Sequence, residues 1–352
     1  MPPVQTDDPY PYRDPYRDYP YDEGGTAPPR RARARRRRRW GRRLLIVALA
    51  LFLAVVAGYF YLDSRLQRID VLSDYDGRPA DTPGTNWLIV GSDSREGLSR
   101  AQRRQLRTGS AAGRRTDTMM LLHMGAGGTS LVSLPRDSFV PIPGRGSNKL
   151  NAAYAFGGPK LLARTLEGAT GLRIDHYAEI GLVGFVGMVD AVGGVNMCIK
   201  EPLRDPKAGL NLKAGCQELD GGDALGFVRT RQFAQGDLER VENQRKLLSA
   251  LISKATSPGT LVNPFRIIPL ALRSTENFAV DERDHLYDLI GFAWGMRGVT
   301  KGDAVTTTVP IGGFGSAPGV GSFVRWDTAR ARILFNALEE DKPIPRSVIT
   351  KK

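Results

Sequence analysis

The sequence predicts an α/β domain with a mixed sheet, preceded by a disordered basic tail and one transmembrane helix. Two observations predict the domain: short apolar runs that end in turn residues, as buried strands do, and segments of helical length that alternate with them. A third observation, an uncharged apolar run near the N-terminus, predicts the membrane helix. The chain has 352 residues, 41% hydrophobic and 25% charged, which suits one large domain or two small ones with appendages.

The apolar run spans residues 44–62 and contains no charged residue. A membrane span needs roughly 20 apolar residues, and Trp40, Tyr59 and Tyr61 stand at its edges, where interfacial aromatic residues are typical. Ten arginines and no acidic residue occupy positions 30–43. Because positive charge stays cytoplasmic, we expect the N-terminus inside the cell and the chain from about residue 63 onward outside it. A cleaved signal peptide is the alternative.

These features divide the chain into four predicted parts. Residues 1–43 form a disordered cytoplasmic tail with an Arg-rich run, because the first 29 residues are rich in Pro, Tyr and charge without periodicity. Residues 44–62 form the transmembrane helix, residues 63–85 a linker, and residues 86–352 an extracellular domain.

Charge is spread unevenly along the chain. The net charge is +13; residues 1–29 contribute −4 (two Arg against six acidic residues) and residues 30–43 contribute +10, which leaves +7 for the rest. The folded part is therefore basic in its own right. Nucleic-acid binding is one interpretation of the Arg run. Beside a membrane span we favour a role in topology and in contact with anionic lipids, and we expect no nucleic-acid partner.

The chain contains two cysteines, Cys198 and Cys216. Such a pair forms a disulfide if the domain is exported and remains two thiols if it is not. The predicted topology places both residues outside the cell, so we expect a Cys198–Cys216 disulfide.

The elements of the domain follow in order. We predict strands at residues 86–91, 118–124, 129–134, 176–180, 195–199 and 305–310, with a Gly-rich hairpin loop at 125–128. We predict two helices within 148–172, broken at Gly157-Gly158-Pro159, and single helices within 181–194, at 238–255 and at 327–340. Because strands alternate with helices, the class is α/β with a mixed sheet.

Strand pairing would bring the charged residues that flank the first three strands to one edge of the sheet. If residues 118–124 pair antiparallel with residues 86–91, the start of one strand lies beside the end of the other. The hairpin then returns the third strand to the same edge, where ligands bind in many α/β folds. The residues that would meet there are Asp93, Arg95, Arg115, Asp117 and Arg136.

Two of these residues, Asp93 and Asp117, are candidate metal ligands. Carboxylates that meet at a strand edge repel each other unless they are protonated, paired or bridged by a metal ion. Ligands that are all oxygen suit Mg²⁺ or Mn²⁺. Ion pairs of each aspartate with the arginine two residues away, Arg95 or Arg115, are the alternative, and a salt bridge in a loop is the alternative for Arg136 with Asp137.

A third polar cluster, residues 227–245, is a candidate anion site. Arg229 and Arg231 share a face if residues 228–231 are extended. Asp237 suits a helix N-cap, and Arg240 and Gln244 follow it at i+3 and i+7 on one helix face. Arginines beside a helix N-terminus favour an anion, and phosphate fits the arginine fork best. A solvated basic face is the alternative.

On these residues the chain resembles the LytR-CpsA-Psr family of cell-wall enzymes, and its high-GC Gram-positive members in particular, from about residue 86 to residue 255. The motifs that carry the resemblance are G-x-D-x-R at 91–95, R-x-D-T at 115–118, S-x-P-R-D at 133–137, K-x-N-A-A-Y-x-x-G-G at 149–158, V-D-A-V-G-G-V at 189–195, L-x-x-V-R-x-R at 225–231 and G-D-x-x-R with a following Gln at 236–244. One position departs from the family: Asn243 stands where many members have a second arginine.

The resemblance implies a three-layer α/β/α fold and transfer of a glycopolymer from a polyprenyl-pyrophosphate carrier to peptidoglycan outside the membrane. It implies that Asp93 and Asp117 hold Mg²⁺ (or Mn²⁺). It also implies two further sets of site residues. Those that would bind pyrophosphate are Arg115, Arg136, Lys149, Arg229, Arg231, Arg240 and Gln244, and those that would act in catalysis are Asp93, Arg95, Arg136 and Asp237.

Two other functions remain as alternatives. A pyrophosphatase acting on polyprenyl-pyrophosphate lipids would use the same residues with water in place of a sugar hydroxyl. A membrane-tethered nucleic-acid-binding regulator would need its folded part inside the cell. The carrier's lipid tail needs an apolar pocket, and the candidates to line it, which core packing explains equally well, are Leu161, Leu162, Leu166, Phe185, Val186 and Met188.

Overall fold

The computed structural model describes residues 30–92, 116–206, 208–230 and 237–350. At a few of these positions, Asp117 and Arg240 among them, it describes the backbone alone. The chain divides into two compact units, Met1–Gly58 and Tyr59–Lys352.

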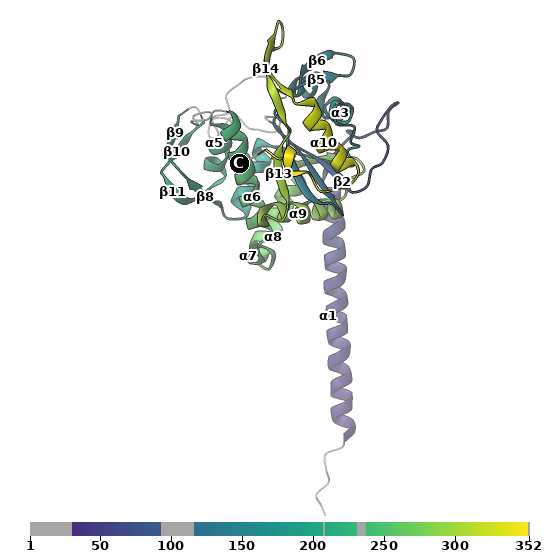
Figure 1. Cartoon of the computed structure of the whole chain (residues 1–352). Coiled ribbons are helices and arrows are strands. Elements are labelled where there is room, and N and C mark those ends of the chain that lie inside the picture. The colour runs from purple at the N-terminus through teal and green to yellow at the C-terminus, as the bar shows by residue number, and fades with distance from the viewer. Residues whose placement is uncertain (1–29, 93–115, 207, 231–236, 351–352) are drawn as a thin grey trace, which may run out of the picture. The chain divides into compact units, whose positions relative to one another are not determined.

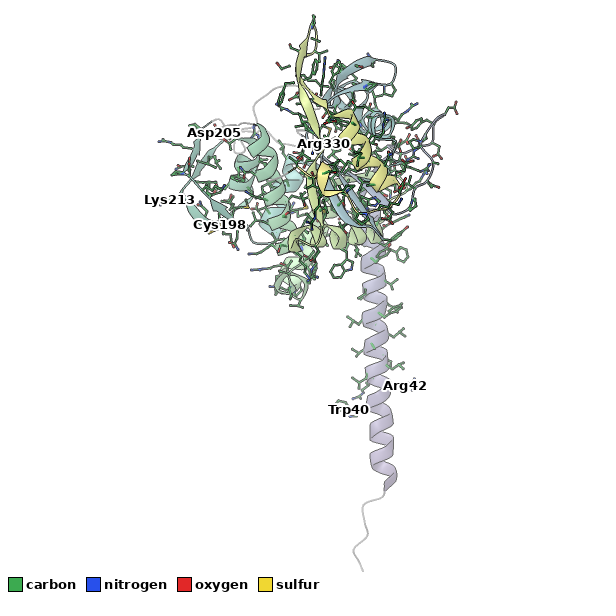
Figure 2. All side chains as sticks on the ribbon, viewed as in Figure 1. Trp40, Arg42, Cys198, Asp205, Lys213 and Arg330 are labelled. Carbon is green, nitrogen blue, oxygen red and sulfur yellow. A yellow bond between two sulfur atoms is a disulfide. The ribbon has the colours of Figure 1, made fainter. Side chains whose placement is uncertain are left out.

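Helix α1 runs from Arg30 to Ser64 and contains a candidate membrane span, Trp40–Ser64. The predicted transmembrane helix at 44–62 is thus confirmed as a helix and extended at both ends. Residues 30–43, predicted to be disordered, belong to the same helix, since arginine and alanine are good helix formers. Figure 2 labels Trp40 and Arg42 on this helix. The rest of the predicted tail, residues 1–29, lies outside the described residues.

A mixed sheet forms the centre of the domain (Figure 1). In spatial order its strands are β1 (Gln67–Ile69), β12 (Phe278–Asp281), β7 (His176–Gly181), β2 (Thr85–Ser92), β3 (Thr116–Gly125), β4 (Gly128–Ser133) and β13 (Val305–Thr308). The pairs β1–β12, β7–β2 and β4–β13 are parallel and the other three are antiparallel. Strand β1 lies within residues 63–85, so the predicted linker already contributes to the sheet.

Helices cover both faces of the sheet, which confirms the three-layer α/β/α architecture. Successive side chains of a strand point to opposite faces. Leu88 and Val90 of β2 accordingly pack with α3 (Leu150–Thr170) and α10 (Thr328–Glu339), while Trp87 and Ile89 pack with α6 (Asp237–Ala255) and α9 (Leu286–Lys301). All four of these β2 residues are buried, which explains why the strand reads as an unbroken apolar run.

The predicted break between two helices is confirmed inside α3. Gly157 and Gly158 leave helical geometry, and Gly158 has a positive φ of 66°, which favours glycine. Pro159 then opens the second segment, as expected of a residue without a backbone N–H.

A smaller part of the domain is built from α4 (Leu182–Ala191), β8 (Val195–Ile199), β9 (Leu203–Asp205), β10 (Leu210–Leu212), β11 (Gly215–Leu219) and α5 (Gly221–Arg229). Strands β8 and β11 pair antiparallel with Cys198 opposite Cys216, and the two residues form the predicted disulfide. Figure 2 labels Cys198, Asp205 and Lys213 in this part. Its own hydrophobic cluster includes Leu247 and Leu251 of α6, so α6 joins it to the central sheet.

The remaining elements are two strands between β4 and α3 and several elements after residue 257. They are β5 (Phe139–Ile142), β6 (Gly146–Lys149), α7 (Pro258–Leu261), α8 (Pro264–Asn277), β14 (Ile311–Ala317), β15 (Gly321–Trp326) and the short helix Arg346–Val348. Strands β14 and β15 form a hairpin, as do β5 and β6.

A buried polar network holds one end of the sheet. The side chain of Asn86 is fully buried; its Nδ2 donates to the Arg173 carbonyl (2.9 Å), and its Oδ1 lies 2.8 Å from His123 Nδ1. His123 Nε2 lies 3.2 Å from Asp341, whose carboxylate also accepts from the backbone N–H groups of Ala126 (2.7 Å) and Gly127 (2.9 Å). The C-terminal segment therefore ties down the hairpin loop between β3 and β4.

Replacing both cysteines (Cys198→Ser with Cys216→Ser) should destabilise the domain. The two residues are 18 positions apart, and closing a loop of that length stabilises by about 3 kcal/mol through the entropy of the unfolded chain. Urea denaturation of the full chain in detergent measures the loss, with Asn196→Ser, an exposed change on β8, as control. Equal denaturation midpoints for the double variant and the control would contradict the expectation.

Candidate functional site

The predicted meeting of strand ends at one sheet edge is confirmed for β2, β3 and β4. Gly91 pairs with Thr118 and Ser92 with Thr116, and the register shifts by one residue between them. Position 117 is therefore the extra residue of a β-bulge beside the end of β2, and Asp93 is the next residue of the chain after Ser92. The buried Thr116 hydroxyl lies within hydrogen-bond distance of the carbonyls of Gly91 (3.0 Å) and Thr118 (3.1 Å), which fixes the bulge.

The third and fourth motifs meet around one carboxylate. Strand β4 returns to the same edge, and Arg136 and Asp137 follow it. Arg136 Nε lies 3.3 Å from one oxygen of Asp137, and Lys149 Nζ lies 3.3 Å from the other. The Asn151 N–H donates to the Arg136 carbonyl (3.0 Å), so the start of α3 holds this loop in place. The salt bridge proposed as the simple alternative for Arg136 is present, and it brings in Lys149 as a second cation.

A carboxylate that the sequence did not single out lies beside this edge. Glu179 of β7 pairs with Val90, two residues before the end of β2. Its two oxygens accept from the hydroxyls of Tyr154 and Tyr177, each at 2.6 Å, and Tyr154 in turn lies 3.4 Å from Ser92 Oγ. Burial, followed by the charge and hydrogen bond of Glu179, raises the pKa of Tyr177 well above its ordinary value. A glutamate between the apolar residues Ala178 and Ile180 of a predicted strand was the available signal.

Arg229 lies at the C-terminal end of α5, where the helix dipole favours a positive charge, and its side chain is half-buried. The extended conformation that the sequence analysis considered for residues 228–231 is wrong for Val228 and Arg229, because Asp220 caps α5 by accepting from the Asp223 N–H (2.8 Å) and the helix continues through them. The chain turns extended at Thr230, whose buried hydroxyl donates to Asp205 (2.8 Å).

The other predicted site residues are described in part or not at all. Asp93, Arg95, Arg115 and Arg231 lie outside the described residues. Of Asp117, Asp237, Arg240 and Gln244 only the backbone is described; the last three lie on the first turns of α6. Helix α6 begins at Asp237, so this residue belongs to the first helical turn instead of preceding it as the predicted N-cap.

The candidate lining residues for a lipid tail do not form one pocket. Leu162 and Leu166 are buried in the cluster between α3 and the sheet, and Leu161 packs against it. Met188 is buried in the cluster of the smaller part, and Phe185 packs against that one. Core packing explains these five residues.

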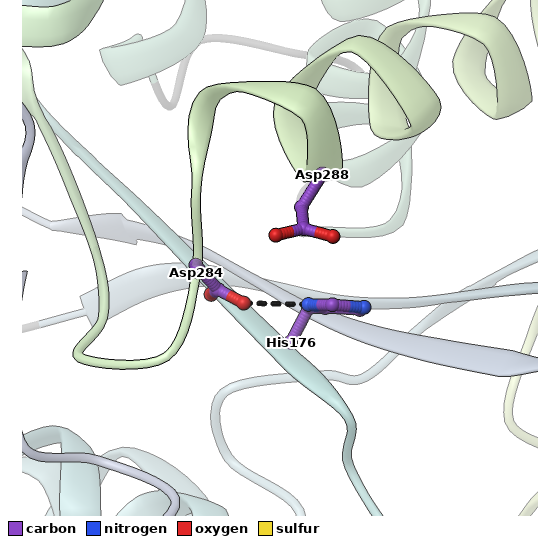
Figure 3. Close-up of side chains that lie close together, drawn as sticks. All are labelled: His176, Asp284 and Asp288. Carbon is purple, nitrogen blue, oxygen red and sulfur yellow. Dashed lines mark hydrogen bonds and ion pairs between the residues drawn. The ribbon is translucent and has the colours of Figure 1, made fainter. Parts of the chain in front are cut away.

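A second polar cluster, His176 with Asp284 and Asp288, has donor atoms within 4.8 Å of one another (Figure 3). His176 Nδ1 lies 2.5 Å from Asp284 Oδ1, while Asp284 Oδ2 accepts from the N–H groups of Tyr177 and Asp281. Asp288 accepts from the His285 N–H at the start of α9 (2.9 Å). Because both carboxylates already serve backbone groups, we interpret this cluster as a structural link between β7 and the β12–α9 connection.

A helix able to span a membrane, followed by an α/β/α domain with charged residues gathered at one sheet edge, places the chain among membrane-anchored α/β/α proteins. A profile of the LytR_cpsA_psr family matches residues 64–323, and the chain belongs to this family. The match extends the resemblance seen in the motifs toward both ends of the domain.

Individual relatives agree with this assignment. Over 295 residues the chain is 52% identical to the probable cell wall biosynthesis protein LcpB of Corynebacterium glutamicum, covering 83% of this chain and 69% of that protein. Over 195 residues it is 34% identical to TagU of Oceanobacillus iheyensis, named a polyisoprenyl-teichoic acid–peptidoglycan teichoic acid transferase, covering 53% of this chain and 56% of that protein. The expected likeness to high-GC Gram-positive members is confirmed by the first of these.

A solved structure shows the same fold. The LytR-Csp2A-Psr enzyme from Actinomyces oris superposes with a TM-score of 0.60 at 24% sequence identity, covering 78% of this chain and 96% of that chain.

Removing the Glu179 carboxylate should destabilise the domain strongly. Glu179→Ala leaves the hydroxyls of two buried tyrosines without their acceptor, at about 1–3 kcal/mol each. Glu218→Ala is the matched control, because Glu218 is exposed and forms a surface ion pair with Lys254, worth about 1 kcal/mol or less. Urea denaturation compares the two, and equal losses of unfolding free energy would refute a structural role for Glu179.

The His176–Asp284 pair predicts a pH dependence of stability. Burial of the ring opposes its protonation, but the hydrogen bond and charge of Asp284 outweigh burial, so the pKa of His176 lies above its ordinary 6.5. A pKa raised by folding gives stability that is fully present below 6.5 and is lost as pH rises through the folded value. The melting temperature of the wild type should therefore fall over this interval.

His176→Asn should abolish that fall in melting temperature. His285→Asn, in the same connection, should retain it because the His176–Asp284 pair stays intact. Parallel pH profiles for the wild type and His176→Asn would show that another group is responsible.

Proposed function

We propose that this protein transfers a glycopolymer from a polyprenyl-pyrophosphate carrier to peptidoglycan outside the membrane. The observation that carries the proposal is the β2–β3 register, which pairs Gly91 and Ser92 of the first motif with Thr118 and Thr116 of the second. Membership of the family and the transferase named among the relatives support it.

The pyrophosphate of the carrier would be bound by cations from three separate elements. Arg136 and Lys149 already stand around Asp137, at the sheet edge, and Arg229 ends α5. Arg115, Arg231, Arg240 and Gln244 complete the proposed set by their place in the motifs. Arginine suits this task because its planar fork pairs with two phosphate oxygens at once.

Asp93 and Asp117 would hold Mg²⁺ or Mn²⁺. The bulge puts the backbone of position 117 beside Ser92, the residue that precedes Asp93 in the chain, which supports a shared ion as the role of these two aspartates. A donor set made of carboxylate oxygens fits these hard cations. When bound, the ion would offset negative charge on the phosphates.

In the proposed reaction a sugar hydroxyl of peptidoglycan attacks the phosphorus that carries the glycan. A new O–P bond forms, the bond from that phosphorus to the bridging oxygen of the pyrophosphate breaks, and polyprenyl phosphate leaves. The arginines would stabilise the charge that develops on the leaving phosphate. Asp237 or Asp93 would accept the hydroxyl proton, and Arg95 would assist at the same edge.

The proposed topology has the N-terminus in the cytoplasm and the catalytic domain outside the cell, with one span between them. The Arg-rich start of α1 supports this orientation. Reporter enzymes fused after Lys352 test this topology. Activity of a reporter that works only outside the cytoplasm would support it. Activity of a reporter that works only in the cytoplasm would favour the regulator hypothesis.

A transfer assay tests the function. The full chain in detergent would receive a short polyprenyl-pyrophosphate-linked glycan, Mg²⁺ and a peptidoglycan fragment. Arg229→Ala and Arg136→Ala should each lower formation of the glycan–peptidoglycan product by about 100-fold or more, because each removes a cation aimed at developing charge. Arg330→Ala on α10, which removes an exposed arginine bonded to the Ser347 carbonyl, is the matched control.

The products decide between the candidates. Release of polyprenyl phosphate without a peptidoglycan product would indicate the pyrophosphatase. Equal rates for Arg229→Ala and Arg330→Ala would exclude Arg229 from the site.

A further inference from the structure

Two helices of the domain expose large apolar side chains on their outer faces. On α9 the exposed residues are Tyr287, Ile290 and Trp294, the last of them 62% exposed. On α8 and the turn before it they are Leu261, Val262, Phe265 and Ile268, with Phe265 88% exposed. We call these seven residues the α8–α9 surface. Large exposed apolar side chains that follow one another along a helix mark an interaction site more often than single exposed ones do.

Helical spacing shows that the exposure follows from how each helix packs. Tyr287, Ile290 and Trp294 stand at i, i+3 and i+7, which is one face of α9. The opposite face carries Phe292 and Met296, which are buried under the sheet. The outer face of α9 is therefore fixed in its direction by the core. On α8 the exposed Phe265 and Ile268 stand at i and i+3, while Leu261 ends α7 and Val262 follows it.

Both helices contact the point at which the chain enters the domain. Asp63, one residue before the end of the apolar helix, accepts from the Leu286 N–H at the start of α9 (2.8 Å). Arg68 binds Asp63 Oδ2 (2.7 Å) and also the Asp284 carbonyl (3.1 Å), which closes the joint. Strand β1, which begins at Gln67, contacts α8. The exposed face of α9 thus starts at Tyr287, next to Leu286, whose N–H binds the end of the helix that contains the candidate span.

The chemistry of the α9 face suits the boundary between lipid and water. Tyrosine and tryptophan favour this boundary because each ring is apolar at one end and polar at the other. The same stripe continues with Arg297, whose guanidinium lies 5.0 Å from the Trp294 ring centroid, and then Lys301. Apolar groups followed by cations match the acyl region and the anionic headgroups of a bilayer.

We propose that the α8–α9 surface rests on the membrane beside the protein's own span, with its apolar side chains among the lipids and Arg297 and Lys301 at the headgroups. A lipid bilayer is the occupant because Asp63, at the end of the helix with the candidate span, binds the start of α9, whose exposed face carries residues suited to the boundary between lipid and water. The proposal depends on α1 spanning a membrane and is independent of the transfer reaction. It would give the domain one fixed orientation on the bilayer.

Depth-dependent quenching tests the proposal on the full chain. Both native cysteines are bonded to each other, so a single introduced cysteine can be labelled without reductant. Ile290→Cys and Phe265→Cys would each carry an environment-sensitive fluorophore. The chain would be placed in nanodiscs of phosphatidylcholine with phosphatidylglycerol that contain lipids with a spin-label quencher near the headgroup. Phe314→Cys on β14 and Ile333→Cys on α10 are matched controls, because both are exposed apolar residues on other elements.

Labels at positions 265 and 290 should shift their emission to shorter wavelength and lose most of their fluorescence to the quencher, while the labels at 314 and 333 should do neither. Nanodiscs of phosphatidylcholine alone should weaken the quenching, because Arg297 and Lys301 then lack anionic partners. Equal, weak quenching at all four positions would overturn the proposal. A blue shift without lipid quenching would also overturn it if the shift disappears when the protein is diluted in lipid. A second copy of the chain would then be the occupant.

Discussion

The register of β2 rests on the hydrogen bonds of one buried side chain, that of Asn86. A strand with apolar residues on both faces has little in its own pattern to stop it slipping, and a slip of one residue exchanges its faces. Asn86 prevents this: its amide and its backbone N–H are satisfied by the Arg173 carbonyl, His123 and Asp175, groups that lie before β7 and on β3. An unsatisfied buried amide would cost about 1–3 kcal/mol, so only one register is acceptable. The position of Ser92 and Thr116 at the far end, and with it the candidate site, follows from that choice.

Local patterns predicted the parts of this protein that local physics controls. The strands at 86–91 and 118–124, the break at Gly157-Gly158-Pro159 and the hairpin loop at 125–128 were all recognisable from apolar runs and turn residues, and the predicted pairing brought the strand ends to one edge. That Arg136 and Lys149 belong to one site could be predicted only from the family motifs. Their common partner, Asp137, binds Lys149 only after the chain between them has folded.

The features that the sequence could not reveal are contacts between distant polar residues. Glu179 bonds to tyrosines that stand on α3 and on its own strand, Thr230 bonds to Asp205, and His176 bonds to Asp284 more than a hundred positions away. No periodicity marks such pairs. At Arg229 a local pattern gave a wrong prediction. Alternating residues favoured an extended segment, but the N-cap at Asp220 starts a helix that continues through Arg229. Asp93 and Arg231 lie outside the described residues, and of Gln244 only the backbone is described.

The edge strand β1 has a consequence for how the protein is made. Gln67 and its neighbours leave the apolar helix first, yet they pair with residues 279–281, and β4 pairs with residues 305–308. In the proposed topology, a domain with this order of strands would not complete its sheet until nearly the whole chain had crossed the membrane. Contacts so distant in sequence also close slowly, since the loop entropy must be overcome before the pairing contributes any stability. With that topology, the newly exported chain would pass through a stage in which its apolar strands lack their partners while the span tethers them to the membrane.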